Sequence, residues 1–175
     1  LERVRDELRT VEQDAVRLEA QQQARGEPAS RALEAVLAME GVYGTIAQLG
    51  KAPAEYTTAL NVAAGAKLHY VVVEDDEVAT SAIRYLKDQK LGRLTFLPLS
   101  KLKPGPVAEA GGKGIIGPAV RMLEFKSQFE PAFRVVFGGT MVVESLEVGR
   151  RLLGKYRMVT PEGELLEKSG AMTGG

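Results

Sequence analysis

The chain has 175 residues and carries 23 basic and 23 acidic side chains, so its formal net charge is zero. Hydrophobic residues make up 45% of the sequence, a proportion typical of globular chains, and the zero net charge excludes nucleic-acid binding driven by overall charge. The absence of cysteine excludes disulfides, zinc-thiolate sites and cysteine nucleophiles, and one histidine leaves little material for a Ser-His-Asp triad. We therefore expect one domain or two small ones, without an obvious catalytic centre.

Targeting signals are missing from the sequence. No run of about 18 apolar residues is present, so no transmembrane helix is predicted. The first residues form a charged amphipathic segment and not a signal peptide, and no initiator methionine is present. We expect a cytoplasmic fragment of a longer protein.

Residues 1–25 carry a heptad pattern, because apolar residues recur at alternating steps of three and four. The positions are Leu1, Val4, Leu8, Val11, Ala15 and Leu18. This spacing predicts the narrow seam of a coiled coil; a single amphipathic helix packed on the domain is the alternative. The run 26–28 (Gly-Glu-Pro) interrupts the pattern, and Ser30 is predicted to cap a second helix that continues to about Met39.

From Gly41 onward, short strands and helices alternate. Strands are predicted over 68–73, 94–97 and 156–160, and a helix over 53–64. A second helix begins after Asp75 or Asp76, with one apolar face made of Val78, Ala79, Ala82, Ile83 and Leu86. Residues 103–114 hold four glycines and two prolines without periodicity, which indicates a loop or linker.

The second half of the sequence repeats the first. The run 41–44 (GVYG) recurs 73 positions later as 114–117 (GIIG), and 72–74 (VVE) recurs 70 positions later as 142–144. These matches predict a mixed α/β fold of two pseudo-symmetric strand/helix subdomains; one continuous α/β sheet is the alternative. The predicted divisions are an arm and leading helix (1–40), subdomain I (41–103), a linker (104–113) and subdomain II (114–175).

Two motifs have a chemical interpretation that competes with a structural one. Gly112, Gly114 and Gly117 spell G-x-G-x-x-G, but a Pro/Gly loop precedes them and Pro118 follows, whereas a dinucleotide site needs a strand before and a helix after. The acids of 74–77 offer ligands for Mg²⁺ or a general base, yet they also lie where a helix start is predicted. Helix capping is the favoured role, and no catalytic residue or metal site is assigned.

Charge is uneven along the chain, with a sum of −3 over 1–40 and +5 over 84–103. Six basic residues produce that excess: Arg84, Lys87, Lys90, Arg93, Lys101 and Lys103. Such a strip can neutralise phosphates without sequence preference; a solvated helix face is the alternative. A smaller equivalent cluster lies in the second half, at Arg150, Arg151, Lys155 and Arg157. The C-terminal run 170–175 (GAMTGG) is either a frayed end or a place where another backbone approaches a sheet edge.

These residues resemble the hinge domain of structural maintenance of chromosomes (SMC) proteins. The resemblance rests on G-x-x-G at 41–44, VVVED at 71–75, GR-x-TFLPL at 92–99 and GAMTGG at 170–175. It covers about 41–175, and the heptads of 1–25 match the adjoining coiled-coil arm. The family resemblance implies a doughnut-like homodimer of two pseudo-symmetric subdomains and no enzymatic activity in the hinge itself.

The resemblance also implies roles for particular residues. The interface is expected at Gly170, Met172, Thr173, Gly174 and Gly175, together with Leu94 and Phe96. DNA binding without sequence preference is expected at the six basic residues of 84–103. The parent is expected to be a nucleoid-associated chromosome-condensation ATPase. Its two long antiparallel coiled-coil arms meet at the hinge, while ATP and kleisin-type partners bind only at distant head domains. For the hinge we expect no cofactor, metal or membrane partner. The alternative is a small α/β ligand- or nucleotide-binding module, or an enzyme, that uses the loop from Gly112 to Gly117.

Overall fold

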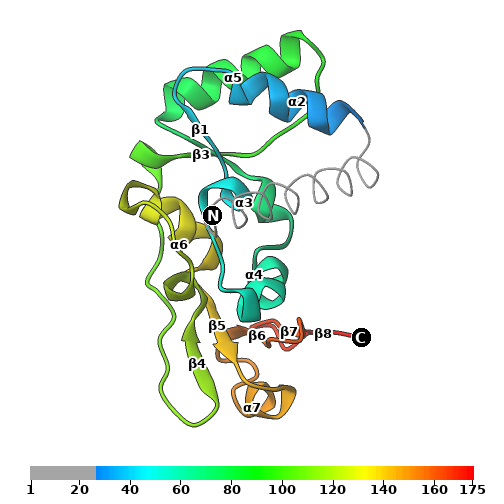
Figure 1. Cartoon of the computed structure of the whole chain (residues 1–175), viewed down its shortest axis with the longest axis vertical. Coiled ribbons are helices and arrows are strands. Elements are labelled where there is room, and N and C mark those ends of the chain that lie inside the picture. Colours follow the sequence, from blue (N-terminus) through cyan, green and yellow to red (C-terminus); the bar gives the residue numbers. More distant parts are fainter. Residues whose placement is uncertain (1–26) are drawn as a thin grey trace, which may run out of the picture.

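The computed structural model describes residues 27–175 (Figure 1). The heptads of 1–25 lie outside the described residues, so the coiled-coil arm stays a prediction. The helices are α2 (Glu27–Leu37), α3 (Ile46–Leu49), α4 (Thr57–Ala64), α5 (Asp76–Asp88), α6 (Glu130–Phe137) and α7 (Leu146–Arg151). The strands are β1 (Val42–Thr45), β2 (Val71–Val73), β3 (Phe96–Pro98), β4 (Ile115–Pro118), β5 (Thr140–Val143), β6 (Arg157–Val159), β7 (Leu165–Leu166) and β8 (Met172–Thr173). None of the helices in this described part is long and apolar enough to cross a membrane.

Two sheets are present, with strand orders β1-β2-β3 and β4-β5-β6-β7-β8. In the first sheet β1 pairs antiparallel with β2, and β2 pairs parallel with β3. The second sheet repeats this arrangement with β4, β5 and β6, and then adds the antiparallel strands β7 and β8. The mixed α/β fold and the internal repeat predicted from the sequence are therefore confirmed. The limits of the two subdomains and of the linker stay a prediction.

The repeated glycines occupy equivalent tight positions. Gly41 and Gly114 precede β1 and β4 with φ of +86° and +88°, a conformation that L side chains rarely adopt. A Cβ on Gly41 would lie 2.6 Å from Cγ2 of Val78, and one on Gly114 would lie 2.5 Å from Cγ2 of Val148. Glycine is required at both positions because the chain approaches the first turn of α5 and of α7 so closely.

The acid cluster contributes a helix cap, as the sequence predicted. Oδ1 of Asp75 accepts a hydrogen bond of 2.9 Å from the backbone N–H of Val78. At the equivalent place in the second half, Oγ of Ser145 accepts one of 3.3 Å from the N–H of Val148. Both caps bind N–H groups that have no partner inside the helix.

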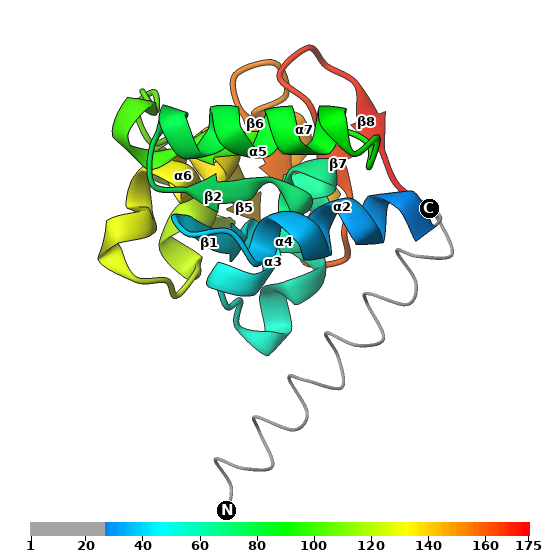
Figure 2. The ribbon, with the colours of Figure 1, turned by 90° about the horizontal axis from the view of Figure 1, so that it is seen from above.

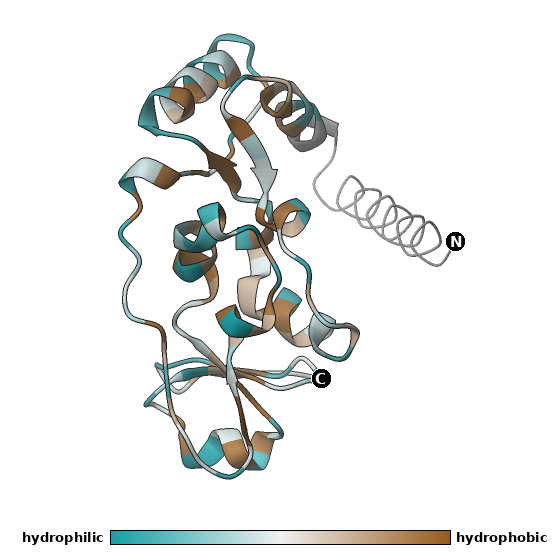
Figure 3. Ribbon diagram, turned by 60° about the vertical axis from the view of Figure 1, so that its left-hand side comes forward, coloured by the Kyte–Doolittle hydropathy of each residue, from teal (hydrophilic) through white to brown (hydrophobic). Residues whose placement is uncertain are grey.

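The two halves share one core. Its buried residues come from both halves: Ile46, Ala59, Leu60, Ala63, Ala64, Val72, Leu97, Ala119, Val120, Phe129, Ala132, Phe133, Val136, Phe137, Val142 and Val159. Hydrophobic residues gather in the strands and on the inner sides of the helices (Figure 3). The opposite face of the first sheet is covered by α2 and α5, which lie side by side when seen from above (Figure 2). A smaller cluster under α7 covers the corresponding face of the second sheet.

An isolated antiparallel bridge joins the halves at Lys51 and Glu124. The N–H of Lys51 donates to the carbonyl of Glu124 at 2.8 Å, and the N–H of Glu124 donates to the carbonyl of Lys51 at 2.9 Å. These residues are 73 positions apart, which is the offset of the repeat between 41–44 and 114–117. The bridge therefore pairs a repeat position with its own equivalent, as expected on a pseudo-two-fold axis.

Arg157 ties the second sheet to the first half. Its Nη1 donates to the carbonyl of Ala63 at 2.8 Å and to Oγ1 of Thr140 at 2.9 Å, while Nε faces Oε2 of Glu167 at 3.2 Å. Arg157 thus has a structural role, which sets it apart from the other members of the second basic cluster. Hydrogen bonds to a charged group contribute about 1.5–3 kcal/mol each.

Some predicted limits need correction. The helix expected to start at Ser30 begins at Glu27, and Ser30 lies inside it. Pro28 is accommodated in the first turn, because a proline there removes only an N–H that has no partner within the helix. The strand expected over 68–73 is confined to β2, since Gly65–His69 forms a 3₁₀-helix.

The strand expected over 94–97 also shifts, and runs over Phe96–Pro98. Its proline is tolerated because β3 is an outer strand, so the missing N–H removes no ladder bond. Ile83, expected on the buried face of its helix, is 51% exposed. The face of α5 that packs on the sheet is narrower, with Ala79, Ala82 and Leu86 buried.

A close contact across the shared core can be tested at Gly50. Its backbone is extended, yet a Cβ would lie 2.4 Å from Cε1 of Phe133. We expect Gly50→Ala to lower the free energy of unfolding by about 1–3 kcal/mol through overpacking. Phe133→Leu in the same chain should relieve the clash, so the double variant loses less than the two single losses added. Urea unfolding measures all three variants.

The control is Gly111→Ala, because Gly111 is exposed and a Cβ there meets nothing within 4 Å. This variant should stay within about 0.5 kcal/mol of the parent chain. Additive losses in the Gly50–Phe133 cycle would contradict a steric contact between the two residues.

Candidate functional site

Each sheet has two outer strands, β1 and β3 in the first sheet and β4 and β8 in the second. The runs 92–99 and 170–175 contain β3 and β8. An open edge presents unpaired N–H and C=O groups and invites another strand to add to it. The two runs therefore lie at outer strands of different sheets (Figure 1).

The C-terminal run forms a hairpin that ends in β8. Leu166 lies opposite Met172, and Leu165 lies opposite Thr173. The N–H of Glu167 donates to the carbonyl of Ala171 at 2.7 Å, which closes the hairpin. Both β8 residues are exposed, Met172 to 46%. The run is thus an ordered edge strand and not a frayed end.

The three glycines of this run differ in what they require. Gly170 has φ of +101° and donates to the carbonyl of Glu167 at 3.0 Å, so the turn itself explains this glycine. Gly175 also has a positive φ, but it is the last residue and a Cβ there would meet nothing within 4 Å. Gly174 has no positive φ, and a Cβ there would meet only the flexible side chain of Glu164, at 3.3 Å. Only Gly174 therefore lacks an explanation within the single chain.

The other edge carries apolar residues that are incompletely covered. Leu94 and Phe96 are half-buried and pack against the cluster beneath α5. A surface pocket of about 330 Å³ lies beside them, lined by Ile83, Leu86, Lys87, Gly92, Arg93 and Leu94. The sequence pattern does not reveal this pocket, because it predicts Ile83 on the buried face of α5. The run 82–86 (AIRYL) offers no periodicity that distinguishes the two placements.

The six basic residues of 84–103 are all exposed, and none has an ion pair among the described residues. They do not form one strip. Arg84, Lys87, Lys90 and Arg93 lie along the second half of α5 and just beyond its C-terminal end. Lys101 and Lys103 follow β3 and lie near the start of α5, where the N–H of Ser100 donates to the carbonyl of Glu74. Because β2 and β3 run parallel, the chain returns along α5 from its end to its start before it enters the segment with Lys101 and Lys103. The two groups of basic residues therefore lie near opposite ends of α5.

The loop with the G-x-G-x-x-G spelling does not have the geometry of a dinucleotide-binding turn. Gly112 and Gly114 lead into β4, and Gly117 lies within that strand. A 3₁₀-helix of four residues follows Pro118. A phosphate site of that type needs a helix N-terminus directly after the glycines. The repeat, not a bound nucleotide, accounts for Gly114 and Gly117.

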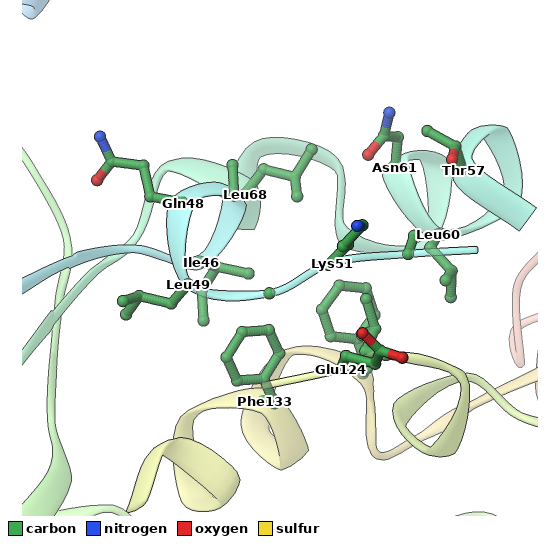
Figure 4. Close-up of a pocket in the computed structure, with 15 residues that line it drawn as sticks. Ile46, Gln48, Leu49, Lys51, Thr57, Leu60, Asn61, Leu68, Glu124 and Phe133 are labelled. Carbon is green, nitrogen blue, oxygen red and sulfur yellow. The ribbon is translucent and has the colours of Figure 1, made fainter. Parts of the chain in front are cut away.

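A second pocket, of about 340 Å³, lies at the junction of the two halves (Figure 4). Its floor consists of core side chains, among them Leu60 and Phe133, both at most 1% exposed. Lys51 and Glu124 contribute to its lining from the two sides of the bridge between the halves. Thr57 adds a hydroxyl to this lining.

Comparison with known proteins gives a family for this arrangement. The model of the "SMC proteins Flexible Hinge Domain" family matches residues 39–153. The chromosome partition protein Smc of Gloeobacter violaceus is 55% identical over 163 residues, covering 91% of this chain and 14% of that protein. Smc of Pyrococcus furiosus is 48% identical over 158 residues, covering 90% of this chain and 13% of that protein. The chain therefore spans only about a seventh of the length of these relatives.

Solved structures are similar in fold. The SMC hinge domain of Pyrococcus furiosus matches with a TM-score of 0.77 and 48% identity, covering 90% of this chain and 84% of that one. An asymmetric dimer of the Geobacillus stearothermophilus SMC hinge domain matches with a TM-score of 0.72 and 27% identity, covering 98% and 82%.

Proposed function

The chain belongs to the SMC hinge domain family, and from this premise we propose that it is a homodimerisation hinge of a chromosome partition protein. In the proposed dimer, β8 of each protomer adds to the β3 edge of the other. The hinge thereby joins two long antiparallel coiled-coil arms. The observation that carries the proposal is the pair of open strand edges at β3 and β8.

The two edges differ, which favours mutual exchange over pairing of like with like. A two-fold dimer that joins β8 to β3 makes the same contact twice, and it covers the β3 and β8 edges of both protomers. Gly174 supports this arrangement, since a residue without a side chain permits a close backbone approach and no contact within the protomer requires it. A related hinge from Geobacillus stearothermophilus forms an asymmetric dimer, which supports the pairing of two hinge copies but not the two-fold symmetry itself.

The proposal for the parent protein follows from its relatives, which are chromosome partition proteins. We propose that the parent is a nucleoid-associated ATPase whose heads bind ATP and kleisin-type partners at the far ends of the arms. In this scheme the hinge itself performs no chemistry and holds no cofactor.

We also propose that the hinge binds DNA weakly and without sequence preference. The supporting observation is that the basic residues of 84–103 are exposed and have no ion pair within the described part of the chain. Free cations of this kind gain counterion-release free energy when they meet phosphates. Lys101 and Lys103 are the favoured contacts, because they lie close in sequence in the exposed segment that follows β3.

The dimer can be tested at Gly174. We expect Gly174→Val to leave the protomer folded, because the backbone there has no positive φ and Glu164 can move aside. At each of the two contacts, overpacking of about 1–3 kcal/mol should raise the dimer Kd by about 30-fold or more in total. Sedimentation velocity measures the mass, and circular dichroism checks the fold.

Gly111→Val is the matched control, since Gly111 is exposed in the loop before β4 and a Cβ there meets nothing within 4 Å. This variant should sediment as the parent does. A parent chain that is monomeric at all concentrations, or a Gly174→Val chain with an undiminished dimer, would overturn the proposed arrangement.

DNA binding can be tested by charge reversal. Lys101→Glu combined with Lys103→Glu should weaken retention of DNA in a low-salt gel shift by about tenfold or more, because two phosphate contacts become repulsive. The control reverses two exposed lysines of the second half, Lys113 and Lys126, with the same change in net charge. Equal loss in both double variants, or no loss in either, argues against a site at 101–103.

A further inference from the structure

We propose that Met172 of one protomer inserts its side chain into the surface pocket beside β3 of a second copy of this chain. The pocket is the 330 Å³ hollow lined by Ile83, Leu86, Lys87, Gly92, Arg93 and Leu94. The inference rests on the proposed homodimer and identifies the side chain that anchors each of its two contacts.

Met172 lies on the face of the second sheet that α7 covers. In an antiparallel pair, residues directly opposite each other project to the same face of the sheet. Met172 lies opposite Leu166, which is fully buried in the cluster beneath α7 together with Met141 and Val148. Met172 therefore projects to the α7 face, but beyond the helix, where it is 46% exposed.

The strands β3 and β8 run in corresponding directions in their two sheets. β8 runs parallel to β6, because two antiparallel steps through β7 separate them. β6 is the repeat equivalent of β3, and α7 is the equivalent of α5, since each strand pairs parallel with the central strand that the helix follows. Thus β3 and β8 run in the same direction relative to the helix-covered faces of their sheets.

The strand β8 of a second copy can add to β3 in two ways. A half-turn within the plane of the sheet brings β8 of a second copy against β3 antiparallel, and it keeps α7 of that copy on the same side as α5. The other possibility pairs the strands in parallel and puts the helices on opposite sides; parallel pairing is slightly less stable per residue. Antiparallel addition therefore places Met172 on the α5 side, where Phe96 and the pocket lie.

The chemistry of the two surfaces is complementary. The pocket offers apolar walls from Leu86, Leu94 and Ile83, and a methionine side chain adapts to hollows of irregular shape. Ile83 at 51% and Met172 at 46% are among the few large apolar side chains that are exposed in the described part of the chain. Their contact removes both from water.

The charges agree with this placement. Lys87 and Arg93 line the pocket, while the segment 160–175, which follows β6 and contains the β7–β8 hairpin, carries three acidic residues against one lysine. Opposite charges around an apolar contact fix the register of partners more than they add affinity. Gly174 is two residues after Met172, on the same face, so it allows the partner's α5 side to approach.

Insertion of Met172 would place Lys87 and Arg93 in the dimer interface, so these two residues would not be available to DNA. The basic residues left for phosphates are Arg84, Lys90, Lys101 and Lys103, all exposed.

The test uses the absence of native cysteine. An affinity-tagged Ile83→Cys chain is mixed with an untagged Met172→Cys chain and treated with a short bismaleimide. We expect a covalent heterodimer on a denaturing gel, and no comparable product from either chain alone. The control replaces Ile83→Cys by Val135→Cys, an exposed aliphatic position on α6 outside the pocket, which should give little product.

The outcomes are separable by sedimentation of the same mixtures before cross-linking. A monomeric parent chain overturns the proposed dimer itself. A dimeric chain whose 83–172 pair links no better than the 135–172 pair overturns the anchor alone. As a second measurement, Met172→Asp should raise the dimer Kd by about tenfold or more, and Met172→Leu should change it little; equal effects of the two would also overturn the anchor.

Discussion

The shared core between the two halves is the constraint on which the rest of the structure depends. Each half brings a small sheet with two apolar faces, and its own helices cover only one of them. The remaining faces, which include Val72 and Val142, are buried together with α4 and α6 in a single cluster. The bridge between Lys51 and Glu124 fixes how the halves meet, since it pairs equivalent positions of the repeat. Neither half can bury its apolar surface without the other, so the positions of the outer strands are fixed together.

The β7–β8 hairpin breaks the symmetry that the core imposes. The first sheet stops at β3, whereas the second continues for two strands past the equivalent position. Two identical edges would favour pairing of like with like; two different edges permit an exchange in which each protomer supplies one of each. Arg157 holds the added hairpin to the body, because its guanidinium binds Glu167 on one side and the carbonyl of Ala63 on the other. The hairpin is therefore a rigid extension and offers an ordered strand to a partner.

Sequence patterns predicted the features that depend on short-range physics. The repeat and the helix cap at Asp75 follow from spacing and side-chain chemistry within a few residues. The features that were missed depend on distant partners. The strand β2 pairs with its neighbour over only three residues. Ile83 is exposed because α5 turns it away from the sheet. Nothing local in the sequence shows that Arg157 binds a carbonyl 94 positions earlier.

The core also decides whether exchange of edges gives a closed dimer or an open chain. Unequal edges that pair head to tail produce a filament unless the contacts return to the first protomer. Two rotations, applied one after the other, relate one protomer to the next. The first is the internal pseudo-two-fold at Lys51 and Glu124, and the second is the half-turn that brings β8 against β3. If the two axes were parallel, the combined operation would be a translation, and successive copies would form an open filament. If the axes cross near a right angle, the product is itself a two-fold rotation, and two chains close the ring. The direction of the internal axis depends on the contact between the halves, which includes the close packing of Gly50 against Phe133, so closure depends on packing inside the protomer as well as on the interface.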